Sequence, residues 1–402
     1  MSRIGLDARM YGPQQGGLGR YIQQLIVHLE QLETTDEFVI FLRKENWDEY
    51  TPANPRFKKI LAEIPWYGWK EQLQFPGIIK KEKIDLMHFP HWNVPIFYND
   101  PFVVTIHDLL LLHFPTKSAS TLGPLSYWFK NQAYKLVLRH AVIKAKHIVA
   151  VSEYTKEDLH KTLGIPLGKI TTTYQAPSKN FQFPIPPAAS GIPLRRDNFQ
   201  ANPNAQNIKN NLSPFPFPLS PRSITKPYAL YVGVAYPHKN LEGLLRAWKI
   251  FQEKYGHDYQ LVLAGKKNYF YNRLKSSVFD LQSSNVIFTD FIPDSELPDL
   301  YQNASLYVMP SLYEGFALPS LEAMLYNLPV ASSNATCLPE VLGSAALYFD
   351  PKNDNEMAEV IHEGLTNNPL RQALATEGKK VVARYSAKKL AETTYQIYRK
   401  SL

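Results

Sequence analysis

The sequence predicts an α/β protein with two doubly wound domains, each built around a parallel sheet. Short apolar runs alternate with segments long enough for a helix, which is the pattern of parallel strands joined by crossover helices. The chain has 402 residues, of which 45% are hydrophobic, and a chain of this length divides more readily into two domains than into one. A segment rich in proline and asparagine, residues 181–227, separates two stretches of similar length.

The apolar runs give the positions of the expected strands. In the first stretch the strands are expected at Arg3–Ala8, Phe38–Leu42, Ile84–Phe89, Phe102–His107 and His147–Val151. In the second stretch they are expected at Tyr228–Gly233, Gln260–Ala264, Val286–Thr289, Leu306–Met309, Pro329–Ser332 and Ala346–Phe349. Parallel sheets of this kind bind ligands at the carboxyl ends of their strands, so we expect a site there, in the cleft between the domains.

These observations also set the expected domain boundaries. Residues 1–180 are expected to form the first domain and residues 228–384 the second. The prolines of residues 181–227 oppose both helices and ladders, so this segment is expected to be a disordered linker. Residues 385–402 have the apolar spacing of one amphipathic helix capped by Ser386, and we expect this helix to pack back toward the first domain.

Composition excludes several classes of protein. The formal charge is +8, and the positive excess lies before residue 228; it is compatible with nucleic acid, an anionic membrane or a phosphorylated ligand. A single cysteine, Cys337, excludes an internal disulfide, and no Cys/His cluster has the spacing of a zinc site. Neither a membrane-spanning run nor a signal-peptide pattern is present, so a cytoplasmic protein is expected.

A glycine-rich segment containing Gly16 and Gly17 follows the first expected strand and leads into a helix expected from Tyr21. Glycines let backbone N–H groups approach a ligand, and a helix N-terminus carries partial positive charge, so the segment suits a phosphate. It lacks both the G-x-G-x-x-G spacing and the lysine of a P-loop. A plain tight turn is therefore an equal alternative for this motif taken alone.

Lys239 stands between the first strand of the second domain and the helix expected from Leu241. A cation is unfavourable just before a helix N-terminus unless an anion joins it, so this position indicates a bound phosphate. A solvated surface lysine is the alternative if the residue is considered by itself.

The segment from Pro310 to Met324 holds two carboxylates, Glu314 and Glu322. Pro319 suits the first turn of a helix, so the residues before it form a loop whose N–H groups lie at a positive helix end. Carboxylates repel a diphosphate but accept hydrogen bonds from hydroxyls, so we expect one to bind a sugar and the other a ribose. Stabilisation of the helix dipole is a credible alternative for Glu322 and a poor one for Glu314.

Four motifs together resemble the retaining family 4 glycosyltransferases, whose GT-B fold has two Rossmann-like domains facing each other across a cleft. The motifs are the opening Gly-Gly-Leu-Gly-Arg-Tyr, Tyr231-Val232-Gly233 followed by Pro237-His238-Lys239-Asn240-Leu241, Tyr313-Glu314-Gly315-Phe316-Ala317-Leu318-Pro319 followed by Leu321-Glu322-Ala323-Met324, and Leu338-Pro339-Glu340-Val341. The resemblance covers nearly the whole chain outside the linker. Within the family, the sequence looks most like the bacterial mannosyltransferase-type members that build lipopolysaccharide and exopolysaccharide.

This resemblance implies transfer of a sugar from a nucleotide-diphospho-sugar, either GDP-mannose or a UDP-sugar, to a glycan or lipid-linked acceptor. It implies that residues 1–180 form the acceptor-side domain and residues 228–384 the nucleotide-sugar donor domain. It implies retention of the anomeric configuration, with no essential metal and no separate cofactor. It assigns Glu314 to the transferred sugar, Glu322 to the ribose, Lys239 to the leaving diphosphate, and His107 to the neighbourhood of the reacting sugar. The further donor-binding residues that it implies are Gly315, Phe316, Ala317 and Leu318 through their backbone, Gly16 and Gly17 from the other domain, and Phe291 and Ile292 beside the base.

Three positions depart from the family pattern. Val234 stands where arginine is common, so one phosphate partner is missing, and His238 or Arg20 is expected to take its place. Ala317 and Asp290 stand where glycine is usual, and Ala317 is expected to crowd its loop mildly. The missing arginine keeps an alternative open, namely a catalytically silent GT-B subunit that binds a sugar nucleotide and scaffolds a polysaccharide-assembly complex.

Two groups of side chains carry further alternatives. For His88, His91, His107 and His113, acceptor contact or a structural role is favoured over a metal site, because they are expected on separate strand ends and loops. The segment from Tyr127 to Lys146 mixes aromatic and basic side chains at helical spacing, which suits a core-facing helix or peripheral contact with an anionic membrane. A nucleic-acid partner is not expected, because no recognition motif accompanies the basic half.

Overall fold

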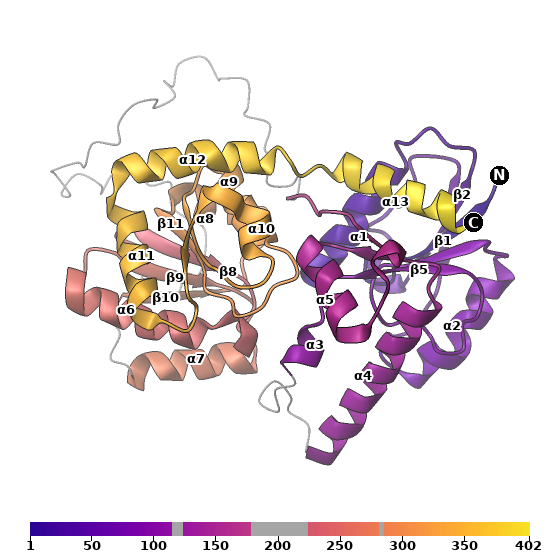
Figure 1. The fold of residues 1–402 in the computed structure, drawn as a ribbon, viewed down its shortest axis with the longest axis horizontal. Helices are drawn as coiled ribbons and strands as arrows, with labels where there is room; N and C mark the ends of the chain where they lie inside the picture. Colours follow the sequence, from indigo (N-terminus) through magenta and orange to yellow (C-terminus); the bar gives the residue numbers. More distant parts are fainter. Residues whose placement is uncertain (115–123, 178–223, 281–284) are drawn as a thin grey trace.

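The computed structural model describes residues 1–114, 124–177, 224–280 and 285–402, which form two α/β domains side by side (Figure 1). The first domain has a sheet of order β3-β2-β1-β4-β5-β6-β7, and the second has a sheet of order β10-β9-β8-β11-β12-β13. The strand pairs in both sheets are parallel. The predicted pair of doubly wound α/β domains is confirmed, while the segment expected to be a linker lies outside the described residues as far as residue 223.

The first sheet contains the five expected strands and two more. Its strands are β1 (Arg3–Asp7), β2 (Glu37–Leu42), β3 (Phe57–Leu61), β4 (Leu86–Phe89), β5 (Phe102–Ile106), β6 (His147–Ala150) and β7 (Ile170–Thr172). The sequence analysis missed β3 and β7, which form the two edges of the sheet. Edge strands do not need the continuous apolar run of a central strand: β3 buries only Phe57 fully, and β7 is three residues long.

Helices surround this sheet. They are α1 (Gly16–Leu29), α2 (Trp69–Lys81), α3 (Leu110–His113), α4 (Pro124–Lys144) and α5 (Glu153–Leu163). The expectation that this helix begins at Tyr21 is wrong. Helix α1 begins at Gly16, so Gly16 and Gly17 lie in its first turn and not in a loop before it. Close packing requires glycine here, since a Cβ on Gly19 would lie 1.9 Å from the carbonyl oxygen of Gly12.

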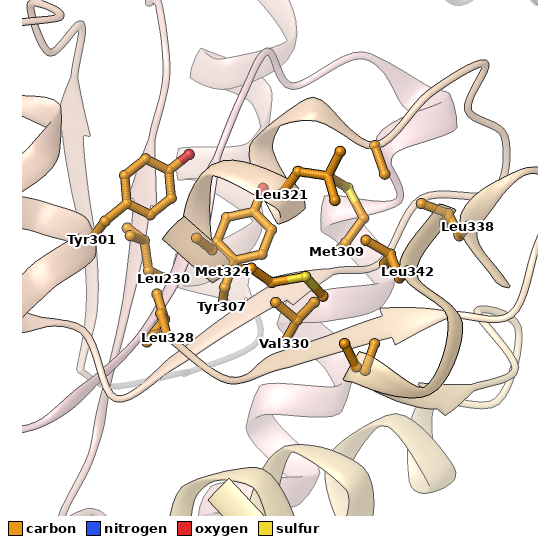
Figure 2. Packing of buried hydrophobic residues seen from close by; sticks show 14 of the residues in the cluster. Leu230, Tyr301, Tyr307, Met309, Leu321, Met324, Leu328, Val330, Leu338 and Leu342 are labelled. Atoms are coloured by element: carbon orange, nitrogen blue, oxygen red, sulfur yellow. The ribbon is translucent and has the colours of Figure 1, made fainter. Parts of the chain in front are cut away.

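The second sheet consists of the six expected strands, β8 (Tyr228–Val232), β9 (Gln260–Ala264), β10 (Val286–Asp290), β11 (Leu306–Met309), β12 (Val330–Ser333) and β13 (Ala346–Phe349). Its helices are α6 (Leu241–Tyr255), α7 (Tyr269–Asp280), α8 (Leu297–Asn303), α9 (Leu318–Leu325), α10 (Leu338–Leu342), α11 (Asp354–Thr366) and α12 (Asn368–Val382). Figure 2 shows Leu321 and Met324 of α9 packed among the buried side chains of this domain, including Met309 and Val330. This apolar face anchors α9 and thereby holds the loop before it at the end of β11.

The last helix, α13 (Ala387–Ser401), leaves the second domain and crosses to the first, where it packs on α1 (Figure 1). Ser386 caps it as expected, by accepting a hydrogen bond from the backbone N–H of Lys389. Tyr398 is fully buried, and its hydroxyl lies 2.6 Å from Nδ1 of His88 in β4. His88, one residue before the end of β4, is fully buried in the sheet, where it joins α13 to Thr105 of β5.

Candidate active site

Lys239 and Glu314 meet at the carboxyl ends of β8 and β11. The Nζ of Lys239 lies 2.7 Å and 2.8 Å from the two carboxylate oxygens of Glu314, and Ser311 donates a hydrogen bond to the same carboxylate at 2.7 Å. The side chains of Lys239 and Glu314 are 19% and 9% exposed. Lys239 thus has a carboxylate of the protein itself as a partner, and the phosphate expected beside it stays a prediction.

The turn before α6 holds Lys239 in place. Asn240 adopts φ 56°, and its side-chain amide donates to the carbonyl oxygens of Pro310 and Pro351. These bonds tie the turn after β8 to the loops after β11 and β13. Lys239 is consequently fixed relative to Glu314 before any ligand arrives.

The loop Glu314–Ala317 runs against the first domain. A Cβ on Gly315 would lie 1.9 Å from the backbone oxygen of His107, so this position requires glycine. Ser152, at the start of α5, donates a hydrogen bond to the carbonyl oxygen of Gly315 at 2.9 Å. Ala317 is fully buried, and its φ of −110° lies outside the left-handed region, so the backbone does not demand the usual glycine here. Mild crowding by its Cβ stays a prediction. Phe316 is buried, and its ring packs against Tyr385.

Glu322 lies in α9 and is 2% exposed. Its carboxylate accepts hydrogen bonds from the Tyr301 hydroxyl at 3.2 Å and from Arg20 of α1 at 3.3 Å, and Arg20 also pairs with Asp294. Burial raises the pKa of Glu322 to about 7, while the charge of Arg20 lowers it. The sequence analysis named both Arg20 and Glu322. Their pairing across the domains could not be predicted, because the two residues are 302 positions apart in the chain.

A small pocket adjoins this pair. It is lined by residues of both domains, among them Arg20, Gln175, Leu318 and Glu322. Gly17 faces the same place, since a Cβ there would lie 4.0 Å from Cδ1 of Leu318, and Gly16 precedes it in the first turn of α1. The expected donor-binding residues Gly16, Gly17, Leu318 and Glu322 are thus brought together.

His107 follows β5 and touches the donor-side loop through its backbone. Its Nε2 lies 2.9 Å from the carbonyl oxygen of Pro90, and Nδ1 lies 3.1 Å from the side-chain amide of Gln175. Burial lowers the pKa of His107 to about 4, so the ring is neutral at physiological pH. Both ring nitrogens have partners inside the first domain, which favours a positioning role over that of a free base.

His238 does not supply the charge of the missing arginine. Burial and the neighbouring Lys239 lower the pKa of His238 to about 3, so its ring is neutral at physiological pH. It stacks on Tyr236 with an interplanar angle of 16°. A neutral His238 brings no charge to replace the missing arginine but can still donate a hydrogen bond, so its place in the donor site stays a prediction.

The expected base site lies after β10. Phe291 is 65% exposed, while Ile292 packs partly against the core of the second domain. Asp290 adopts φ 59°, the left-handed region that glycine enters most easily, and Lys275 pairs with its carboxylate at 3.0 Å. The exposed ring of Phe291 is available for stacking.

Sequence reasoning missed most contacts between the domains. Glu340 of α10 accepts hydrogen bonds from the backbone N–H groups of Glu153 and Tyr154, at the positive end of α5, at 2.7 Å and 2.8 Å. Tyr313 donates to Asp158 at 2.8 Å. Tyr313 and Glu340 stand in motifs that the sequence analysis identified. Their partners, Asp158 and the start of α5, belong to no such motif.

His91 and His113, the other two histidines of the group considered for a metal, have polar partners within the first domain, and His91 also lies 3.4 Å from the Tyr67 hydroxyl. His91 bonds to Asn93, and Nε2 of His113 lies 2.9 Å from Asp158. Among the residues that the structure describes, no three His, Cys, Asp or Glu side chains are grouped so that they could hold a metal ion.

Two family models match the chain. The model described as Glycosyl transferases group 1 matches residues 220–381, and the model described as Glycosyltransferase Family 4 matches residues 15–176. The chain belongs to the group 1 glycosyltransferases with the GT-B fold. This glycosyltransferase is 26% identical over 398 residues to O-antigen chain mannosyltransferase B from Escherichia coli, a match that covers 95% of this chain and 96% of that protein.

Solved structures share the fold of this glycosyltransferase. Sucrose-phosphate synthase from Thermosynechococcus elongatus matches with a TM-score of 0.72 and 18% identity, over 100% of this chain and 99% of that one. Anabaena Alr3699/HepE, solved in complex with UDP and glucose, matches with a TM-score of 0.70 and 14% identity over 100% of both chains. The GT-B fold and the family expected from the sequence motifs are confirmed.

Proposed function

We propose that this glycosyltransferase is a retaining, metal-independent enzyme that moves a hexose, mannose in the first instance, from a nucleotide-diphospho-sugar to a glycan or lipid-linked acceptor. The observation that carries the proposal is the pairing of Lys239 with Glu314 just before the N-terminus of α9, the helix that also carries Glu322. The mannosyltransferase relative supports mannose as the sugar and O-antigen or lipopolysaccharide assembly as the setting. GDP-mannose is the expected donor, a UDP-sugar is the alternative, and no separate cofactor takes part.

The chemistry proposed for this site is electrostatic. Cleavage of the donor places positive charge on the anomeric carbon and negative charge on the diphosphate. Lys239 and the N–H groups at the start of α9 stabilise that negative charge in place of a metal ion. Glu314 holds the sugar hydroxyls and Glu322 the ribose hydroxyls. In a front-face step the leaving phosphate oxygen takes the proton of the acceptor hydroxyl, and attack by Glu314 to form a covalent intermediate is the alternative.

Thermal-shift measurements with GDP-mannose, UDP-glucose and UDP-galactose test donor binding, because a ligand of the native state raises apparent stability. Transfer and slow donor hydrolysis are then assayed with and without EDTA. Hydrolysis or transfer that persists in EDTA supports the proposal, whereas loss of activity in EDTA contradicts metal independence. Inversion of the anomeric configuration, read by NMR, contradicts retention.

A second function is favoured by one observation. Val234 stands where the family commonly has arginine, and His238 is neutral, so the diphosphate loses one charge partner. A silent subunit that binds a sugar nucleotide within a polysaccharide-assembly complex accounts for this. Tight donor binding with neither transfer nor hydrolysis across the panel would favour the silent subunit over the enzyme.

Donor affinity is expected to increase as the pH rises through about 7, the pKa to which burial raises Glu322. Below that pKa the carboxyl keeps its proton and accepts hydroxyl hydrogen bonds weakly; above it the carboxylate accepts them strongly. Calorimetric titration with the nucleotide at a series of pH values measures the effect. Glu322→Gln removes the titration and should flatten the profile, and a wild-type profile already flat around neutrality would contradict the assignment.

No helix in the described ranges is long and apolar enough to span a membrane. We propose a cytoplasmic enzyme that contacts the anionic inner face of the membrane through α4, which projects from the first domain (Figure 1). One face of α4 is core, with Tyr134 and Leu138 buried. On the other face Phe129, Leu136 and Ile143 recur every two turns and are 59%, 60% and 61% exposed. The basic side chains beside them are exposed as well, namely Lys130, Lys135, Arg139 and Lys144.

Cosedimentation with phosphatidylglycerol vesicles is expected to be salt-sensitive and to fall at least about tenfold when Phe129, Leu136 and Ile143 are all replaced by serine. Tyr255→Ser on α6, which removes an exposed aromatic ring elsewhere, serves as the control. Binding that ignores salt, or that survives the triple change, excludes this contact.

A further inference from the structure

Helix α5 lies on the side of the first domain that faces the second domain (Figure 1). Ser152, its N-cap residue, donates a hydrogen bond to the carbonyl oxygen of Gly315 at 2.9 Å. Asp158, in the second turn of the helix, accepts a hydrogen bond from the hydroxyl of Tyr313 at 2.8 Å. Both partners belong to the loop that carries Glu314, so one helix of the first domain holds this loop on either side of the carboxylate.

Tyr313 belongs to the second domain but is buried against the first, and it is only 4% exposed. Its hydroxyl accepts a hydrogen bond from the backbone N–H of Leu109 at 3.2 Å. Burial and the charge of Asp158 raise the pKa of Tyr313, so the hydroxyl keeps its proton and donates it to that carboxylate. Aromatic rings of the first domain surround the tyrosine ring, with centroids 5.5, 5.7 and 6.0 Å away, namely those of His113, Phe114 and Tyr154.

Asp158 is itself held in place by the first domain. It is 8% exposed, and its carboxylate accepts a hydrogen bond from the hydroxyl of Thr162 at 2.7 Å. Both of its oxygens lie 2.9 Å from Nε2 of His113 in α3. An ionised carboxylate only accepts hydrogen bonds, so this nitrogen carries the proton and donates. These bonds fix Asp158 independently of Tyr313, and the carboxylate is therefore a preorganised acceptor for the tyrosine.

Glu314 is consequently held by both domains. In the second domain its carboxylate pairs with Lys239, and its backbone N–H donates to the hydroxyl of Thr336 at 3.1 Å. The residues before and after it, Tyr313 and Gly315, are bonded to the first domain. The place of this carboxylate relative to a donor therefore depends on the contact between the domains, and not on the second domain alone.

We propose that Asp158 and Tyr313 are positioning residues for sugar transfer, because their hydrogen bond lets the first domain align the Glu314 carboxylate with the donor sugar. The inference rests on the proposed function, since it concerns the carboxylate assigned to that sugar. Misplacing a group in an active site by about 1 Å can lower the rate by about a hundredfold. Glu322 and the start of α9 do not take part in this bond, so its loss affects turnover and leaves nucleotide binding intact.

Tyr313→Phe tests the bond, because phenylalanine keeps the buried ring and removes only the hydroxyl. We expect kcat to fall at least about tenfold, while the dissociation constant for the nucleoside diphosphate of the donor, GDP or UDP, stays within about twofold by calorimetry. Asp158→Asn should keep most of the wild-type kcat, since its amide oxygen still accepts the bond. Asp158→Leu should lose as much as Tyr313→Phe.

Glu340→Ala is the matched control. It removes two other hydrogen bonds between the domains, at 2.7 Å and 2.8 Å, which also end on α5 but do not involve the loop of Glu314. A wild-type kcat in Tyr313→Phe overturns the proposal. An equal loss of kcat in Glu340→Ala overturns it as well, because the effect would then come from weaker contact between the domains in general.

Hydrogen exchange separates this inference from the proposed function, because it requires no turnover. The backbone N–H of Glu314 is bonded to Thr336, so its exchange reports opening of the loop. We expect Tyr313→Phe to speed this exchange at least about tenfold and Glu340→Ala to change it less than about twofold. Unchanged exchange in Tyr313→Phe refutes the anchor, whereas transfer by the wild type leaves the transferase standing. Faster exchange in Tyr313→Phe combined with no transfer by the wild type refutes the transferase and leaves the anchor.

Discussion

Replacing Glu314 with glutamine is expected to lower the rate of sugar transfer by at least about a hundredfold, as for other preorganised charged groups in active sites. The side chain of Glu314 is 9% exposed, and both of its carboxylate oxygens accept hydrogen bonds from Nζ of Lys239. Glutamine keeps the shape and can still accept the bond from Ser311, so the fold should hold. What is lost is the negative charge that opposes Lys239 and binds the sugar hydroxyls.

Lys239→Met is expected to reduce turnover similarly, and the double variant should lose less than the two single losses combined, because the two residues act as one unit. The measurement is kcat with saturating donor, with folding checked by thermal denaturation. Asp354→Asn, which breaks the exposed pair with Arg246, is the matched control. Wild-type rates in Glu314→Gln, or fully additive effects in the double variant, would remove this pair from the catalytic step.

Replacing Arg9 with methionine is expected to lower the free energy of unfolding by about 3–5 kcal/mol, the usual cost of breaking a buried ion pair. Arg9 is 2% exposed, and its guanidinium donates hydrogen bonds to Asp7, Glu71 and the carbonyl oxygen of Ile64. Its guanidinium also lies 3.9 Å from the ring centroid of Phe75. Methionine fills much of the same space but leaves two carboxylates without a counter-charge.

Urea denaturation measures this loss. Arg246→Met breaks an ion pair whose arginine is 50% exposed, and it should cost less than about 1 kcal/mol. Equal midpoints for the two variants would show that the network around Arg9 contributes little to stability. Adding Glu71→Gln to Arg9→Met should recover part of the loss, since one orphaned charge is then removed.

The central strands could be predicted because burial on both faces makes them continuous apolar runs. The edge strands β3 and β7 could not be predicted in this way. In β3 the apolar run is interrupted by Lys58 and Lys59, and β7 is only three residues long. Lys239, Glu314 and Glu322 could be named from loop and helix patterns, because each pattern is local. Their partners could not: Lys239 and Glu314 are 75 residues apart, and Arg9 and Glu71 are 62 apart. Such pairs depend on where the sheets bring their loops, which no local pattern encodes.

The return of α13 to the first domain has a consequence for biosynthesis. His88 and Tyr398 touch across 310 positions of the chain, and Leu390 and Ile397 belong to the same buried cluster as Ile4 and Leu25. During translation the first domain therefore keeps part of this cluster open to water until α13 has been made, after the whole of the second sheet. All strands of the second domain, β8–β13, precede α13 in the chain, so this sheet can form before the first domain receives its last helix.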